Sequence, residues 1–286
     1  MKIDTHQHFW SYQLQDFAWI DASMPVLQQD RSPAHVRACM QTAGVDACMA
    51  VQARCVSEET DYLLSLASQT PGLIGVVGWM DFNHPQVREQ VAAWAQHPKL
   101  CGFRHILQDE PSVSAWVNQA AVAQGLRLLQ QQQLSYDVLV FAHQLSEVQD
   151  FCQQHDQHWL VLDHVAKPNL KTPDAAQDAA WFAQLKHMAR LPHVMCKLSG
   201  LVTETNWQRG LHDADVSAIH QRFDQALSVF GAQRLMYGSD WPVCELAASY
   251  ARVHGIAQDW ANTRLSSDEQ AAFWSGNAMR CYGLTG

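Results

Sequence analysis

Short apolar segments and longer amphipathic segments alternate along this 286-residue chain. The short segments are rich in apolar and β-branched residues, as buried strands are, and the longer segments show the spacing of helices. Strands are predicted at residues 3–8, 47–53, 73–80, 100–106, 135–141, 159–165, 194–198 and 234–239. Helices are predicted near residues 33–43, 58–70, 84–96, 112–124, 144–155, 177–190, 212–229 and 245–260, with a ninth near 266–276.

Regular alternation of strand and helix predicts a parallel sheet with right-handed crossovers. Eight such units favour closure into a (β/α)8 TIM barrel over an open sheet, and 286 residues suffice for a fold that needs about 250. No long Gly/Ser-rich linker divides the chain, so residues 1–286 are expected to form one domain. Residues 9–31 are long for a loop and carry several aromatic residues, which predicts a lid or a side wall.

Composition excludes several classes of function. The net charge of −9 comes without a Lys/Arg cluster, which argues against a nucleic-acid partner. No apolar run approaches the ~20 residues of a membrane-spanning helix, and no signal peptide precedes the first strand. The eight cysteines contain no CxxC pair and are expected to be reduced, as in the cytoplasm. A homodimer is compatible with this composition, which does not decide the oligomeric state.

The carboxyl ends of the predicted strands carry the residues that could do chemistry, because this end of a barrel holds the active site. Strand 1 ends with His6 and His8, whose i, i+2 spacing points both imidazoles the same way, toward one metal ion or one substrate oxygen. Strands 4, 6 and 8 lead into Arg104, His164 and Asp240. Polar groups at so many strand ends would be costly to bury together without a purpose.

Taken singly, each of these residues also has a structural interpretation. A chain with 15 histidines contains chance pairs, so His6 and His8 alone are weak evidence. Asp240 precedes Trp-Pro and would also suit the cap of a turn. His164 would also suit a hydrogen-bonded core position, and Arg104 a structural ion pair.

A second group of residues is predicted to line the mouth of the barrel and bind substrate. Two are cations, and the others offer hydrogen-bond partners or apolar walls of the kind that a sugar needs. The interpretation that the aromatic members only pack loops stays open. The candidates are Gln52, Arg54, His105, His143, Lys167, Trp207 and Trp241.

The strings DTHQHFW, GFRHILQDEP, VLDHVAKP, KLSGL, YGSDWPV and GNAMRCYGL together resemble the amidohydrolase superfamily, and within it the "amidohydrolase 2" branch. The resemblance spans essentially the whole chain and is strongest to sugar-lactone hydrolases of the L-fuconolactonase and L-rhamnonolactonase type. It implies a hydrolase that opens an aldonolactone to the hydroxy acid. Its alternatives are a pyrone-dicarboxylate lactonase or a metal-dependent decarboxylase of the same branch, and, from another class, a non-catalytic binding barrel.

The resemblance also implies roles. Asp240 matches the acid that acts as general base on water, Arg104 an arginine that binds substrate oxygen, and His164 the strand-6 histidine. His6 and His8 match the metal-binding pair, with Asp240 as a third ligand.

One feature departs from the pattern of the two-metal members. These proteins bridge two ions with a carboxylated lysine or an acid at the end of strand 4, where this chain has Arg104 and His105. One divalent ion, most simply zinc, is therefore expected, and a metal-free form of the mechanism stays open because lactones are activated esters.

Overall fold

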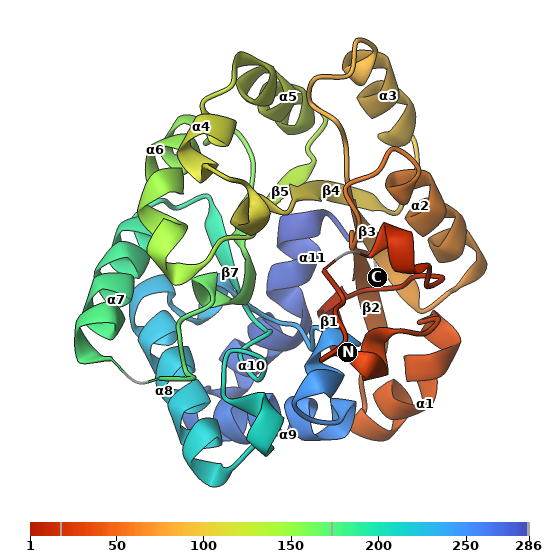
Figure 1. Cartoon of the computed structure of the whole chain (residues 1–286). Helices are drawn as coiled ribbons and strands as arrows, with labels where there is room; N and C mark the ends of the chain where they lie inside the picture. Colours follow the sequence, from red (N-terminus) through yellow and green to blue (C-terminus); the bar gives the residue numbers. More distant parts are fainter. Residues whose placement is uncertain (18, 173, 285–286) are drawn as a thin grey trace.

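Eight parallel strands lie side by side in chain order, and helices surround them (Figure 1). The computed structural model describes residues 1–17, 19–172 and 174–284. The strands are β1 (Ile3–Gln7), β2 (Ala47–Val51), β3 (Leu73–Gly78), β4 (Leu100–His105), β5 (Ser135–Val138), β6 (Leu160–Leu162), β7 (Val194–Leu198) and β8 (Leu235–Tyr237). Backbone hydrogen bonds close the seam between β1 and β8: the Asp240 amide donates to the His6 carbonyl and the His8 amide to the Trp241 carbonyl. The predicted (β/α)8 barrel is confirmed.

The helices follow the strands near the predicted places, but several bounds differ; for example, the segment predicted at 144–155 is α-helical only from Gln149, after a 3₁₀ segment. The α-helices are α1 (Pro33–Ala43), α2 (Glu59–Gln69), α3 (Val87–Trp94), α4 (Val113–Val117), α5 (Ala120–Gln131), α6 (Gln149–Gln154), α7 (Ala175–Ala189), α8 (Asp213–Phe230), α9 (Tyr250–Arg264), α10 (Ser267–Ala271) and α11 (Asn277–Tyr282). The helix predicted at 112–124 is two helices, α4 and α5, and the second extends to Gln131. The predicted segment 266–276 continues through a π-helical turn into α11, which the pattern did not indicate.

Local sequence explains where several helices begin and end. Ser32 precedes Pro33 at the start of α1, where proline loses no hydrogen bond, and Gly44 ends that helix in the left-handed conformation. Ser266 and Glu269 form a reciprocal capping box at the start of α10. Such ends fix the length of each helix and so the position of the loop that follows.

Two hydrophobic cores hold the barrel. The larger lies between the outer faces of the strands and the helices, and includes Leu63, Phe103 and Leu162. The smaller fills the barrel itself, where Met49 and Met195 meet side chains of α11. Figure 1 shows α11 within the ring of strands. The C-terminal helix therefore closes the end of the barrel opposite to the loops that follow the strands.

Residues 9–31 form a wall with a small apolar cluster of its own. Trp10, Phe17 and Leu27 are buried together in it. The Trp10 and Arg31 backbones pair, which ties the two ends of the segment to each other. Within the described part of the chain, no helix is long and apolar enough to cross a membrane. All eight cysteines are free, and most are buried.

Candidate active site

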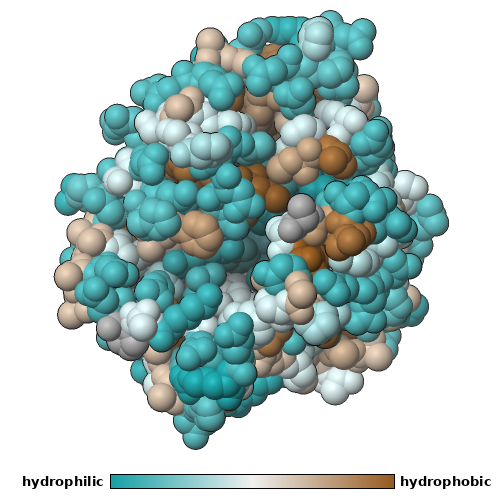
Figure 2. All heavy atoms as spheres, in the orientation of Figure 1, coloured by the Kyte–Doolittle hydropathy of each residue, from teal (hydrophilic) through white to brown (hydrophobic). Residues whose placement is uncertain are grey.

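A cavity of about 340 Å³ lies beyond the carboxyl ends of the strands. The volume falls in the usual range for small-molecule sites, about 300–1,000 Å³. Figure 2 shows a largely hydrophilic face with a hollow near its centre. The loops after β1, β2, β4, β5, β6, β7 and β8 supply the lining: His8, Trp19, Met24, Ala53, Arg104, Ile106, Gln108, Asp109, Leu139, Phe141, His164, Lys167, Lys171, Thr203, Glu204, Trp207, Asp240, Val243 and Leu246.

Three imidazole rings converge on one carboxylate oxygen in the floor of this cavity. Nε2 of His8 lies 3.3 Å from Oδ1 of Asp240. Nε2 of His6 lies 3.8 Å from the same oxygen, and Nε2 of His164 lies 3.9 Å from it. All four side chains are buried. The structure therefore brings these four predicted residues together in one cluster.

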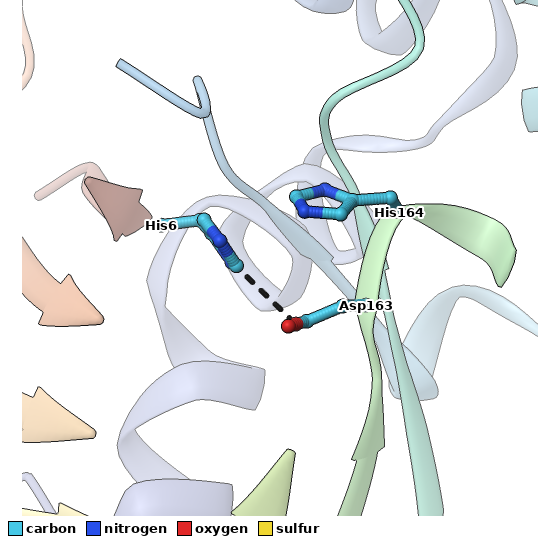
Figure 3. A group of neighbouring side chains, drawn as sticks. All are labelled: His6, Asp163 and His164. Atoms are coloured by element: carbon cyan, nitrogen blue, oxygen red, sulfur yellow. Dashed lines mark ion pairs between the residues drawn. The ribbon is translucent and has the colours of Figure 1, made fainter. Parts of the chain in front are cut away.

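The other ring nitrogen of each histidine is held by an oxygen, which orients the ring. Nδ1 of His8 donates to the Val51 carbonyl over 2.8 Å. Nδ1 of His164 lies 2.8 Å from Oγ of Ser199. Nδ1 of His6 faces Oδ1 of Asp163 at 3.4 Å, and Figure 3 shows these two side chains pointing at each other with His164 beside them. Oxygen partners of this kind are typical of histidines that bind metal ions through the remaining nitrogen.

Unusual backbone conformations place two of these residues. β6 ends at Leu162, and His164 to Lys167 all have positive φ angles, between 46° and 57°. Asp240, after the end of β8, has φ 61°. Strain of this sort costs about 1–3 kcal/mol per residue and is concentrated at functional sites. Gly200 is required beside His164, because an added Cβ there would lie 2.5 Å from Nδ1 of the ring.

The inward direction of Arg104 is fixed from several sides. Its Nε donates to Oε1 of Gln52 over 3.0 Å and its Nη2 to the Gln52 carbonyl over 2.6 Å. Its Nη1 donates to Oδ2 of Asp163 over 2.9 Å and lies 3.2 Å from Nε2 of His6. Gln52 thus supports Arg104 and does not itself line the cavity.

A buried ionic network lies beneath the cluster, inside the barrel. Nζ of Lys197 lies 2.5 Å from Oδ2 of Asp137, 3.3 Å from Oδ1 of Asp163 and 3.3 Å from Nδ1 of His6. The Tyr282 hydroxyl, on α11, donates to Asp137 over 3.0 Å. Burial alone lowers the pKa of Lys197, but the carboxylates of Asp137 and Asp163 outweigh it and raise that pKa above its ordinary value. Lys197 is therefore a fixed positive charge.

The protonation states in the cluster follow from burial and charge. Burial lowers the pKa of His164 to about 4, so this ring is neutral at physiological pH. Burial also lowers the pKa of His6 well below its ordinary value. Burial raises the pKa of Asp240, but His164, His8 and His6 outweigh it, so that the pKa falls below its usual range. The cluster thus combines the neutral imidazoles of His6 and His164 with an ionised carboxylate.

The predicted substrate-binding residues divide into two sets. Lys167 and Trp207 line the cavity. His105 does not, because it follows Arg104 on β4 and points to the opposite face, where it receives a hydrogen bond from Trp79 and lies 2.7 Å from Glu110.

Three further predicted residues also lie outside the cavity lining. Arg54 is held by Glu59, at 2.7 Å. Trp241 is buried and donates to Glu245 over 2.9 Å. His143 is exposed and lines a neighbouring cavity instead.

Sequence reasoning missed the residues that orient the predicted ones. Asp163 immediately precedes His164 within the apolar segment predicted as a strand at 159–165, and a carboxylate at that position was a usable signal. Asp137 and Lys197 are charged residues inside apolar strand segments, a pattern that indicates a buried pair. Ser199, directly after β7, lies 2.8 Å from Nδ1 of His164 and helps to orient its ring.

Among the residues that the structure describes, two groups of three have donor atoms within 4.8 Å of one another and fit a metal ion: His6, Asp163 and His164, and His6, His8 and Asp240. In the first group, Arg104 donates to Oδ2 of Asp163, and the positive charge of Lys197 lies 3.3 Å from Oδ1, so two cations already face the carboxylate. The second group offers imidazole nitrogen and carboxylate oxygen, which suit zinc and similar divalent ions. The His6, His8 and Asp240 group is therefore the better candidate.

Comparison with known proteins decides the family. Residues 3–284 match the family model described as amidohydrolase. The chain belongs to the amidohydrolase family. The predicted resemblance is confirmed, and with it the prediction of an enzyme of this hydrolase family.

Two curated relatives of this amidohydrolase are L-fucono-1,5-lactonases. That of Burkholderia multivorans is 51% identical over 286 residues, which cover 99% of this chain and 96% of the relative. That of Burkholderia ambifaria is 31% identical, with 98% and 95% covered. A crystal structure of an amidohydrolase from Burkholderia multivorans with bound zinc superimposes with a TM-score of 0.97 at 51% identity and covers all of both chains.

A probable 2-pyrone-4,6-dicarboxylic acid hydrolase from Acinetobacter baumannii matches with a TM-score of 0.77 at 15% identity, over 99% of both chains. At this identity the match shows the shared fold alone.

Proposed function

We propose that this amidohydrolase hydrolyses the ring ester of a sugar lactone, with L-fucono-1,5-lactone as the first substrate to test and L-rhamnonolactone as a second. The observation that carries the proposal is the convergence of His6, His8 and His164 on Asp240 in the floor of a cavity of small-molecule size. The two L-fucono-1,5-lactonase relatives support this choice of substrate.

The charge of the cavity supports a neutral substrate. Its cations are Arg104, Lys167 and Lys171, and its carboxylates are Asp109, Glu204 and Asp240. Among the side chains alone, three positive and three negative charges leave little net attraction for a substrate with two carboxylates. An uncharged aldonolactone adds no charge to this lining. A pyrone dicarboxylate adds two negative charges and calls for an excess of cations.

Asp240 is the proposed general base. It is ionised, its carboxylate lines the cavity, and it accepts the proton of the attacking water. The resulting hydroxide adds to the lactone carbonyl carbon and forms a tetrahedral oxyanion. The negative charge that develops there increases the proton affinity of the nearby carboxylate. When the intermediate collapses, the ring C–O bond breaks and Asp240 returns the proton to the departing ring oxygen.

Arg104 and His164 are the proposed stabilisers of the oxyanion. Arg104 lines the cavity and is fixed by Gln52 and Asp163, so its positive charge is oriented before the reaction begins. His164 is neutral, and when its Nδ1 accepts a hydrogen bond from the Ser199 hydroxyl, its Nε2 carries a hydrogen that it can donate into the cavity. Both groups act where negative charge develops.

A single divalent ion, zinc in the first instance, is proposed at His6, His8 and Asp240. Such an ion would supply Lewis acidity and lower the pKa of a water molecule. The donor set of this chain and the bound zinc of the Burkholderia multivorans amidohydrolase support this assignment. The protein's own residues hold the ligands in place through Val51 and Asp163.

A pH-indicator assay tests the proposed function. The purified protein is given L-fucono-1,5-lactone, L-rhamnonolactone, aldonolactones of other configuration and 2-pyrone-4,6-dicarboxylate, each with and without a chelator. We expect acid release from at least one neutral aldonolactone and a decrease with chelator. Turnover of the pyrone dicarboxylate alone, or of no lactone under any condition, contradicts the proposal.

A further inference from the structure

Glu204 occupies a rigid place in the wall of the cavity. It lies in the turn after β7, in which its amide donates to the Leu201 carbonyl and the Thr203 hydroxyl donates to the Gly200 carbonyl. Its own carbonyl accepts the Leu170 amide over 3.1 Å, so the loops after β6 and β7 are tied together at this residue. The backbone of Glu204 is therefore positioned by hydrogen bonds on both sides.

The Glu204 carboxylate differs from the other carboxylates of the interior because no described residue binds it. Asp163, Asp137 and Glu59 each accept hydrogen bonds from several donors or pair with cations. Among the described residues, no hydrogen bond and no ion pair within 4 Å reaches the carboxylate of Glu204. It lines the cavity with Asp240 and is only partly exposed. A carboxylate that is neither paired nor fully solvated has unused capacity to accept hydrogen bonds.

The surroundings of Glu204 suit hydroxyl groups better than a second charge. Burial raises the pKa of Glu204, and Lys167 and Lys171 counter that shift without approaching to ion-pair distance. Both lysines line the same cavity and can donate to ring or hydroxyl oxygens, and Trp207 adds an apolar wall. A sugar ring presents both kinds of surface, since its hydroxyl groups donate and accept while its C–H groups are apolar.

We propose that Glu204 is the specificity-determining residue of this site and accepts hydrogen bonds from hydroxyl groups on the ring of the lactone. This inference rests on the proposed function and names its substrate class: neutral, polyhydroxylated lactones. Simple alkyl lactones leave Glu204 without a partner, and carboxylated lactones are repelled by it. Glu204 takes no part in opening the ester, which is the work of Asp240 and its neighbours.

The test pairs two six-membered lactones with two variants. L-Fucono-1,5-lactone carries ring hydroxyl groups, and δ-valerolactone has the same kind of ring ester without them. Glu204→Met keeps the length of the side chain and removes the acceptor, and Glu204→Gln keeps one acceptor oxygen. Glu89→Met, on the exposed face of α3, is the matched control.

For Glu204→Met, we expect kcat/KM for L-fucono-1,5-lactone to fall by about 10- to 100-fold, the effect of losing a hydrogen bond to a charged group. For δ-valerolactone we expect a change below about threefold. Glu204→Gln should lie between Glu204→Met and the unchanged protein, and Glu89→Met should match the unchanged protein with both lactones. Equal losses with both lactones, or no loss with either, overturn the proposal.

Binding of L-fucose, a neutral pyranose that is not hydrolysed, separates failure of this inference from failure of the proposed function. Calorimetry should show binding to the unchanged protein and weaker binding to Glu204→Met. Binding that depends on Glu204 in a protein that turns over no lactone refutes the proposed reaction and retains the hydroxyl-binding role. Lactone turnover together with sugar binding that is unaffected by Glu204→Met refutes the role of Glu204 alone.

Discussion

Arg104 contacts His6 at Nε2, the ring nitrogen through which His6 would bind a metal ion. Nη1 of Arg104 lies 3.2 Å from Nε2 of His6, and the same Nε2 faces Asp240. The other ring nitrogen of His6 is engaged by Lys197 and Asp163. A divalent ion at His6, His8 and Asp240 would therefore compete with Arg104 for the lone pair of Nε2 and would be repelled by its charge.

Replacing Arg104 should tighten metal binding. We expect Arg104→Met to raise the affinity for zinc by at least about tenfold, because a unit charge about 4 Å from an ion is worth several kcal/mol at the effective dielectric constant of a protein site. Competition with a chromogenic chelator measures the affinity. Lys171→Met, which removes a cation from another part of the cavity wall, is the control and should have a smaller effect. Weaker zinc binding by Arg104→Met would show that Arg104 supports the site.

The buried network of Lys197, Asp137 and Tyr282 should contribute strongly to the free energy of unfolding. Lys197→Met leaves Asp137 buried without its cation, and we expect a loss of about 3–5 kcal/mol in the free energy of unfolding. Tyr282→Phe removes one hydrogen bond to the same carboxylate and should cost about 1–3 kcal/mol. Urea unfolding of chelator-treated protein gives both values. If Lys197→Met cost less than Tyr282→Phe, the ion pair would not be the main interaction here.

Acid should destabilise the protein in part through His254, a histidine outside the cavity. Burial, helped by Lys2 at 3.4 Å, lowers the pKa of His254 to about 4. Its ring stays neutral in the folded protein where the unfolded chain is protonated, so stability is present above about pH 6.5 and is lost as the pH falls toward 4. We expect a loss of about 1 kcal/mol or more across this window.

Measurement of the unfolding free energy against pH checks this assignment. His254→Gln should reduce this dependence. An unchanged slope in His254→Gln would assign the effect to other residues.

The fold could be predicted from the sequence because each strand–helix unit carries its own pattern. Alternation along a strand correctly gave His6 and His8 a common direction, and applied to β4 it would also have put His105, the neighbour of Arg104, outside the cavity. Strand periodicity did not apply to His164 and Asp240, since β6 and β8 end before them and their positive φ angles set their directions.

The remaining parts of the site depend on contacts across the barrel. Asp163 contacts Arg104 on β4 and Lys197 on β7. No local sequence pattern indicates contacts between residues so far apart in the chain. Helix α11 lies too close to the end of the preceding helical segment to be separated from it by periodicity, although Tyr282 reaches the interior of the barrel. Local sequence therefore predicted which residues meet in the floor of the cavity better than which residues orient them.

Turnover of L-fucono-1,5-lactone by Asp240→Asn tests the central claim most directly. The substitution keeps the shape of the side chain but cannot accept the proton of water, so kcat should fall by about 10²–10⁴-fold, the usual effect of losing a general base. Circular dichroism melting on the same preparation shows whether the variant is folded. The account predicts a folded protein with this loss of kcat, and a folded Asp240→Asn variant with close to the original kcat would contradict it.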